Sequence, residues 1–131
     1  MPSTPNICPC QNTQYVNCCG VYHSGQKKAE NAGKLMRSRY SAYVLELEDY
    51  LLKTWHDSTR PSESLFDGQK TQWLELKVKS FAESADQQSA TVEFVAIYKI
   101  NGKAHRLHEI SRFVREGDQW FYVDGQFPEI K

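Results

Sequence analysis

Four cysteines close to the N-terminus, Cys8, Cys10, Cys18 and Cys19, are the side chains best suited to chemistry in this chain. Zinc prefers four thiolate or imidazole ligands in a tetrahedron, and a structural site takes all four from the protein. The spacing therefore predicts one structural zinc ion bound by these thiolates. His23 is the alternative fourth ligand, because adjacent cysteines cannot always both point at one ion. A four-thiolate site also accepts iron, which leaves the metal open.

Disulfides and reactive thiols are the two competing interpretations of these cysteines. The N-terminal segment lacks the basic and apolar regions of a secretory signal, and no apolar stretch approaches the ~18 residues of a membrane span. We therefore expect a cytoplasmic protein, in whose reducing surroundings disulfides rarely persist. Reactive thiols usually occur as Cys-x-x-Cys or beside a positioned histidine, so metal binding is favoured.

A second group of side chains could line a pocket. Glu109 shares one face of a predicted strand with Leu107 and Phe113, so its carboxylate points toward an apolar side. Burial there requires a partner, an arginine or a tyrosine, or makes Glu109 a general acid or base. His56 and Tyr40 complete the catalytic candidates, although an imidazole at a helix end can equally cap carbonyl groups. The pocket candidates are Arg37, Arg39, Tyr40, Trp55, His56, Glu109, Tyr122 and Asp124.

The elements that position these residues follow from hydrophobic periodicity. Apolar residues recur at helical spacing over about residues 31–47, and a shorter helical segment follows at about 49–55. The second half alternates at period two and predicts four strands, at about residues 73–79, 92–100, 103–114 and 120–124. In the first strand this alternation places Leu74, Leu76 and Val78 on one face and Trp73 on the other. Asn101-Gly102 favours a type I′ hairpin turn.

Helices followed by an antiparallel meander predict an α+β fold with helices packed on one face of a sheet. Residues 1–25 show neither helical nor strand periodicity and are interpreted as a zinc knuckle built from loops. Residues 26–131 are expected to form the α+β domain. Sixteen basic residues balance sixteen acidic ones, so the chain has no net positive charge that would attract it to nucleic acid. Binding to RNA or the ribosome would depend on the locally basic stretch at residues 27–39.

Several short motifs carry a resemblance to known proteins. Cys8-Pro9-Cys10, Tyr15, Cys18-Cys19-Gly20 and Tyr22-His23-Ser24-Gly25 resemble the SEC-C zinc motif of the translocase motor SecA. The segments 35–43, 50–56, 108–113 and 120–125 resemble the uncharacterised bacterial YchJ-like family. The chain departs from the motif in having seven residues, not eight, between its second and third cysteines, and it lacks the second, C-terminal zinc motif of many relatives.

The resemblance implies a zinc motif followed by a cystatin-like, nuclear transport factor 2-like cone, in which a curved antiparallel sheet wraps around helices. In SecA the motif contacts the chaperone SecB and ribosomes, which implies protein partners in export or translation. The residues expected to meet such a partner are Gln14, Tyr15, Val16, Tyr22, Lys27 and Lys28.

We therefore expect a non-enzymatic zinc protein that docks a protein partner through the knuckle. A cone of this kind also leaves room for a small ligand between sheet and helices. Two alternatives stay open: a hydratase or isomerase that uses Glu109 and His56, and RNA or ribosome binding through residues 27–39.

Overall fold

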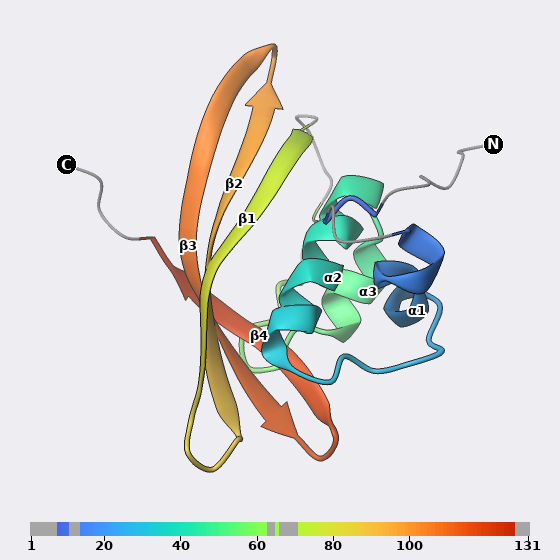
Figure 1. The fold of residues 1–131 in the computed structure, drawn as a ribbon, viewed down its shortest axis with the longest axis vertical. Helices are drawn as coiled ribbons and strands as arrows, with labels where there is room; N and C mark the ends of the chain where they lie inside the picture. Colours follow the sequence, from blue (N-terminus) through green and yellow to red (C-terminus); the bar gives the residue numbers. More distant parts are fainter. Residues whose placement is uncertain (1–7, 11–13, 63–64, 66–70, 128–131) are drawn as a thin grey trace.

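The computed structural model describes residues 8–10, 14–62, 65 and 71–127. They form one antiparallel sheet with the strand order β1-β2-β3-β4, in which each strand pairs with its neighbour in sequence. The strands are β1 (Gln72–Glu83), β2 (Ser89–Ile100), β3 (Lys103–Glu116) and β4 (Gln119–Gln126). Helix α2 (Ala32–Leu45) covers one face of this twisted sheet, and α3 (Glu48–Lys53) packs against α2 (Figure 1). The predicted α+β architecture is confirmed.

Helix α2 begins and ends at local signals in the sequence. The side chain of Asn31 accepts a hydrogen bond from the backbone N–H of Lys34 at 2.8 Å and so caps the first turn. At the other end Glu46 adopts a left-handed conformation with φ 58°, which stops the helix. Leu35, Met36 and Tyr40 lie buried along the side that faces the sheet.

Helix α3 is shorter than predicted, because the chain leaves helical geometry to pair with β4. The backbone carbonyl of Thr54 accepts a hydrogen bond from the N–H of Tyr122 at 2.9 Å. The N–H of His56 in turn donates to the carbonyl of Tyr122 at 2.8 Å. A backbone donor or acceptor that is used by the sheet cannot continue the helix, so α3 ends at Lys53.

The predicted hairpin turn is confirmed, whereas the predicted face of one strand residue is wrong. Asn101 and Gly102 both have positive φ angles, 52° and 78°, as a type I′ turn requires. In β1 a register shift between Trp73 and Glu75 turns Trp73 toward the helices and leaves Leu74 38% exposed. A bulge adds one residue to one strand and so reverses the alternation beyond it.

The described part of the N-terminal segment packs into the main core. Cys8, Cys10 and Cys19 belong to the same buried cluster as Val92 and Phe113. This segment contains two short helices, η1 (Tyr15–Asn17) and α1 (Cys19–His23), where the sequence predicts only loop. In Figure 1, α1 lies on the side of α2 that faces away from the sheet. Across the described ranges, no helix combines the length and apolar character needed to cross a bilayer.

Candidate metal centre and cavity

The sulfur atoms of Cys8, Cys10, Cys18 and Cys19 all lie within 4.8 Å of one another. The Sγ of Cys10 is 3.5 Å from that of Cys18 and 3.7 Å from that of Cys19, and the adjacent Cys18 and Cys19 sulfurs are 4.0 Å apart. A regular tetrahedron with Zn–S bonds of about 2.3 Å has S–S edges of about 3.8 Å. These four thiols could therefore hold one metal ion.

Two neighbouring elements fix the sulfur atoms in place. Ser41 of α2 is fully buried and donates its hydroxyl hydrogen to the Cys19 sulfur at 3.2 Å, while its Oγ lies 3.3 Å from the Cys8 sulfur. A Cβ on Gly20 would come within 2.6 Å of the Tyr15 carbonyl oxygen, so only glycine permits this contact between η1 and α1. Groups that orient metal ligands in this way raise the affinity of a site.

The charges around the cluster suit a cation bound by thiolates. Hydrogen bonds to Cys10 and Cys8, together with burial, raise the pKa of the Cys19 thiol, so crowded thiols do not all ionise by themselves. A divalent cation removes this obstacle because it stabilises the thiolates. The resulting site would carry net negative charge. Lys34 and Arg37 border a shallow hollow beside Cys18 and offset that charge.

His23 lies outside the cysteine cluster and uses both ring nitrogens elsewhere. Its Nε2–H donates to the carbonyl of Ser38 at 2.8 Å, and its Nδ1 accepts from the Tyr15 hydroxyl at 2.6 Å. Burial lowers the pKa of His23, which keeps this tautomer neutral. The imidazole therefore connects η1 to α2, and the structure gives it no place among the four sulfur atoms.

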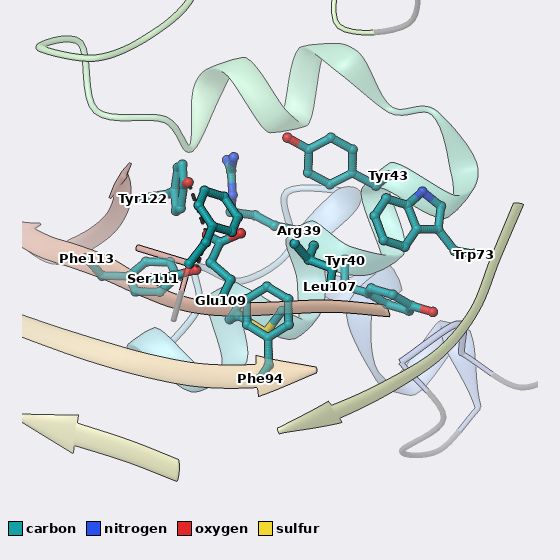
Figure 2. Close-up of a pocket in the computed structure, with 12 residues that line it drawn as sticks. Arg39, Tyr40, Tyr43, Trp73, Phe94, Leu107, Glu109, Ser111, Phe113 and Tyr122 are labelled. Carbon is teal, nitrogen blue, oxygen red and sulfur yellow. Dashed lines mark hydrogen bonds between the residues drawn. The ribbon is translucent and has the colours of Figure 1, made fainter. Parts of the chain in front are cut away.

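A cavity of about 310 Å³ lies between α2 and the concave face of the sheet. Figure 2 shows Arg39, Tyr40 and Tyr43 reaching it from α2, opposite Glu109, Ser111 and Phe113 of β3. Its wall is mostly aromatic. The lining residues are Met36, Arg39, Tyr40, Tyr43, Trp73, Phe94, Leu107, Glu109, Ser111, Phe113, Tyr122 and Phe127.

Glu109 supplies the carboxylate of this cavity, as the strand alternation predicts. The side chain is only 8% exposed, and its Oε2 accepts hydrogen bonds from Ser111 at 2.7 Å and from the Tyr122 hydroxyl at 3.3 Å. Burial and then the nearby Glu109 raise the pKa of Tyr122, which keeps that hydroxyl a donor. Gly125 in β4 makes room for the carboxylate, since an added Cβ would meet Oε2 at a distance no real contact allows.

Arg39 lines the same cavity and anchors the end of α3. One nitrogen, Nη1, donates to the Leu51 carbonyl and to the Thr54 hydroxyl, each at 2.7 Å. The guanidinium lies over the rings of Trp55 and Tyr122, with its central carbon 5.0 Å and 4.6 Å from the ring centres. Within the described ranges no hydrogen bond or ion pair joins it to Glu109, so the partner of Glu109 is the tyrosine Tyr122 and not an arginine.

The other candidates take different places. The Nε2 of His56 lies 2.6 Å from a carboxylate oxygen of Glu116, and His56 does not line the cavity. The acid–base pair of His56 and Glu109 is therefore not formed. Asp124 accepts two hydrogen bonds from the Arg112 guanidinium at 2.6 Å and 2.7 Å on the outer side. Tyr40 does line the cavity, and burial raises its pKa to about 12.

Sequence reasoning missed several cavity residues. Ser111 follows Glu109 by two positions, so the same alternation could have placed it on that face. Trp73 could not be found in this way, because the bulge in β1 hides its orientation. Tyr43 lies one turn beyond Arg39 on the wall of the cavity, where the helical repeat could have placed it.

Comparison with known proteins identifies relatives that align with most of the chain. A UPF0225 protein of Bordetella parapertussis is 50% identical over 127 residues, which cover 95% of each chain. One of Cupriavidus metallidurans is 51% identical over 131 residues, covering 95% of this chain and 92% of the relative.

Two solved structures share the fold. A SEC-C motif containing protein from Rhodopseudomonas palustris matches with a TM-score of 0.76 at 30% identity, over 89% of this chain and 94% of that one. Another from Psychrobacter arcticus matches with a TM-score of 0.74 at 27% identity, over 98% and 86%. The family model for the YchJ middle, nuclear transport factor 2-like domain matches residues 31–125. The chain belongs to the YchJ-like, UPF0225 family, with a cysteine cluster ahead of the nuclear transport factor 2-like domain.

Proposed function

We propose that this protein binds one zinc ion through Cys8, Cys10, Cys18 and Cys19, and that the ion has a structural role. The cluster of four sulfur atoms at the spacing of a zinc tetrahedron is the observation that carries the proposal. Four thiolates leave no open position for a substrate or water, so the ion would fasten the N-terminal segment to α2 instead of catalysing a reaction.

The zinc knuckle then serves as a docking surface for a protein partner. Val16 in η1 is 64% exposed, so this segment presents an aliphatic side chain to solvent. Gln14 beside it is exposed as well, whereas the hydroxyl groups of Tyr15 and Tyr22 are engaged with His23 and Glu30. Partners in protein export or translation are the class that SEC-C motifs suggest, and Val16 is the central contact of the proposal.

RNA binding through the basic stretch is less well supported. Lys27 and Lys34 both pair with Glu30, at 3.5 Å and 3.7 Å, and Lys28 pairs with Asp118 at 3.1 Å. Arg39 is buried and cannot contact a phosphate. The stretch therefore presents less positive charge than its sequence indicates.

Metal analysis tests the zinc site. Plasma mass spectrometry of the purified protein should give about one zinc per chain. Cys18→Ser should lose most of it, whereas the control Ser24→Ala, which changes an exposed side chain outside the cluster, should retain it. Metal-free wild-type protein, or full zinc in Cys18→Ser, would contradict the proposal.

Binding to purified SecB and to ribosomes tests the docking surface separately. The zinc-loaded protein should bind one of them, and Val16→Asp should abolish the binding without loss of zinc. Binding that survives Val16→Asp, or no binding to either, would contradict the docking role. Binding that disappears at high salt and depends on Lys28 would instead favour the RNA alternative.

A further inference from the structure

We propose that the cavity between α2 and the sheet binds a small planar molecule that carries a cationic N–H group, such as an amidinium, and that Glu109 receives this group. The proposal concerns a site remote from the cysteine cluster and stands independently of the zinc site.

The size and wall of the cavity define the apolar part of the ligand. Ligand pockets in proteins span about 300–1,000 Å³, so a cavity of about 310 Å³ suits a molecule of one or two rings. The ring of Trp73 packs against Tyr40 and Tyr98, with centroids 5.8 Å and 5.2 Å apart, and these contacts hold it in the wall. Phe94 and Phe113 close the opposite side (Figure 2). Flat aromatic faces stack well on planar ligands.

Glu109 defines the polar part. Both of its hydrogen bonds, from Ser111 and Tyr122, go to Oε2, and Oε1 accepts none from the residues that the structure describes. Among the described residues every fully buried side-chain oxygen has a hydrogen-bond partner, so Oε1 is open to water in the cavity. A ligand N–H pointing at Oε1 would replace that hydration. An ionised carboxylate only accepts hydrogen bonds, so the ligand must donate.

The positive charge of Arg39 does not make the cavity favour an anionic ligand. Its Nη1 is held by Leu51 and Thr54, and its guanidinium lies over the rings of Trp55 and Tyr122. The Nη1 hydrogens are therefore already used, and an anionic ligand would in addition lie beside the Glu109 carboxylate. Aromatic faces also attract cations through their quadrupoles, which favours a positively charged ligand further.

Three molecules of nearly equal shape test the proposal: benzamidine, benzamide and benzoate. Titrations of the zinc-loaded full chain, followed by NMR at the Trp73 indole N–H, should give the tightest binding for benzamidine and the weakest for benzoate. Glu109→Gln keeps the size and both accepted hydrogen bonds but removes the charge. It should weaken benzamidine binding about tenfold or more, the usual loss when a hydrogen bond to a charged group is removed.

Glu93→Gln is the matched control. Glu93 lies on β2, pairs with His108 at 2.6 Å and does not line the cavity, so this change should leave benzamidine binding unchanged. Benzoate binding as tightly as benzamidine would overturn the proposal, and so would an unchanged affinity in Glu109→Gln. Absence of any shift at Trp73 up to about 10 mM of all three probes, a concentration that reveals millimolar binding, would overturn it as well.

Discussion

Gly125→Ala should destabilise the protein through its contact with Glu109. A Cβ at position 125 would lie 2.5 Å from the Glu109 carboxyl carbon and 2.8 Å from its Cγ. Atoms cannot approach so closely, so the carboxylate must move away and leave its hydrogen bonds with Ser111 and Tyr122. Hydrogen bonds to charged groups contribute about 1.5–3 kcal/mol each. Because the Tyr122 bond is long, we expect a loss of about 3 kcal/mol in the free energy of unfolding.

The double variant isolates this contact. In a Glu109→Ala background the obstructing atoms are absent, and Gly125→Ala should then be neutral or stabilising by about 0.5 kcal/mol, since alanine reduces the freedom of the unfolded chain. The coupling free energy between the two positions should therefore be about 3 kcal/mol. Glu109→Gln serves as the control, because glutamine has the same length and keeps the obstruction. Gly125→Ala should still destabilise this variant, by about 1–3 kcal/mol, since two neutral hydrogen bonds of about 0.5–1.5 kcal/mol each are lost.

Urea unfolding of the zinc-loaded variants, followed by circular dichroism, gives these free energies. Additive effects of Gly125→Ala and Glu109→Ala would refute the reasoning. They would mean that the Glu109 side chain does not lie against β4, and the cavity would then lack its carboxylate.

Three further predictions concern the metal centre and Arg39. Ser41→Ala should weaken zinc binding about 10–100-fold in a competition titration with a chelator, because Cys8 and Cys19 lose their shared hydroxyl partner. His23 has a lowered native pKa, so the unfolded chain takes up its proton first and stability falls as pH drops below about 6.5, by up to about 1.4 kcal/mol per pH unit. Urea unfolding of zinc-loaded His23→Gln should show a shallower decline than the wild type between about pH 7 and pH 5.5; equal slopes would contradict this. Arg39→Lys should cost about 2 kcal/mol in the same assay, because an ammonium group cannot reproduce the flat contact with Trp55 and Tyr122; an unchanged midpoint would show that this contact is dispensable.

Elements with local signals in the sequence were predicted well. The helical repeat of α2 and the Asn101-Gly102 turn depend on neighbours in the chain, and each lies where expected. The alternation of β3 likewise placed Glu109 on the inner face correctly. In these cases the physical cause lies within a few residues of the feature.

Features that depend on distant partners were not predictable. The ladder between β1 and β2 contains a bulge at Trp73, and a single extra residue reversed the face of that ring. His56 was paired with Glu109 in the sequence hypothesis, but pairing of the chain after α3 with β4 carries it to Glu116 instead. The close approach of Gly125 to Glu109 also requires the folded sheet, since the two residues come from different strands.

X-ray absorption at the zinc edge of the protein as purified tests the central claim most directly. The account predicts four sulfur neighbours at about 2.3 Å and no nitrogen ligand, because His23 is committed to Tyr15 and Ser38. A first shell that contains a nitrogen or oxygen ligand, or protein that contains no zinc, would contradict it.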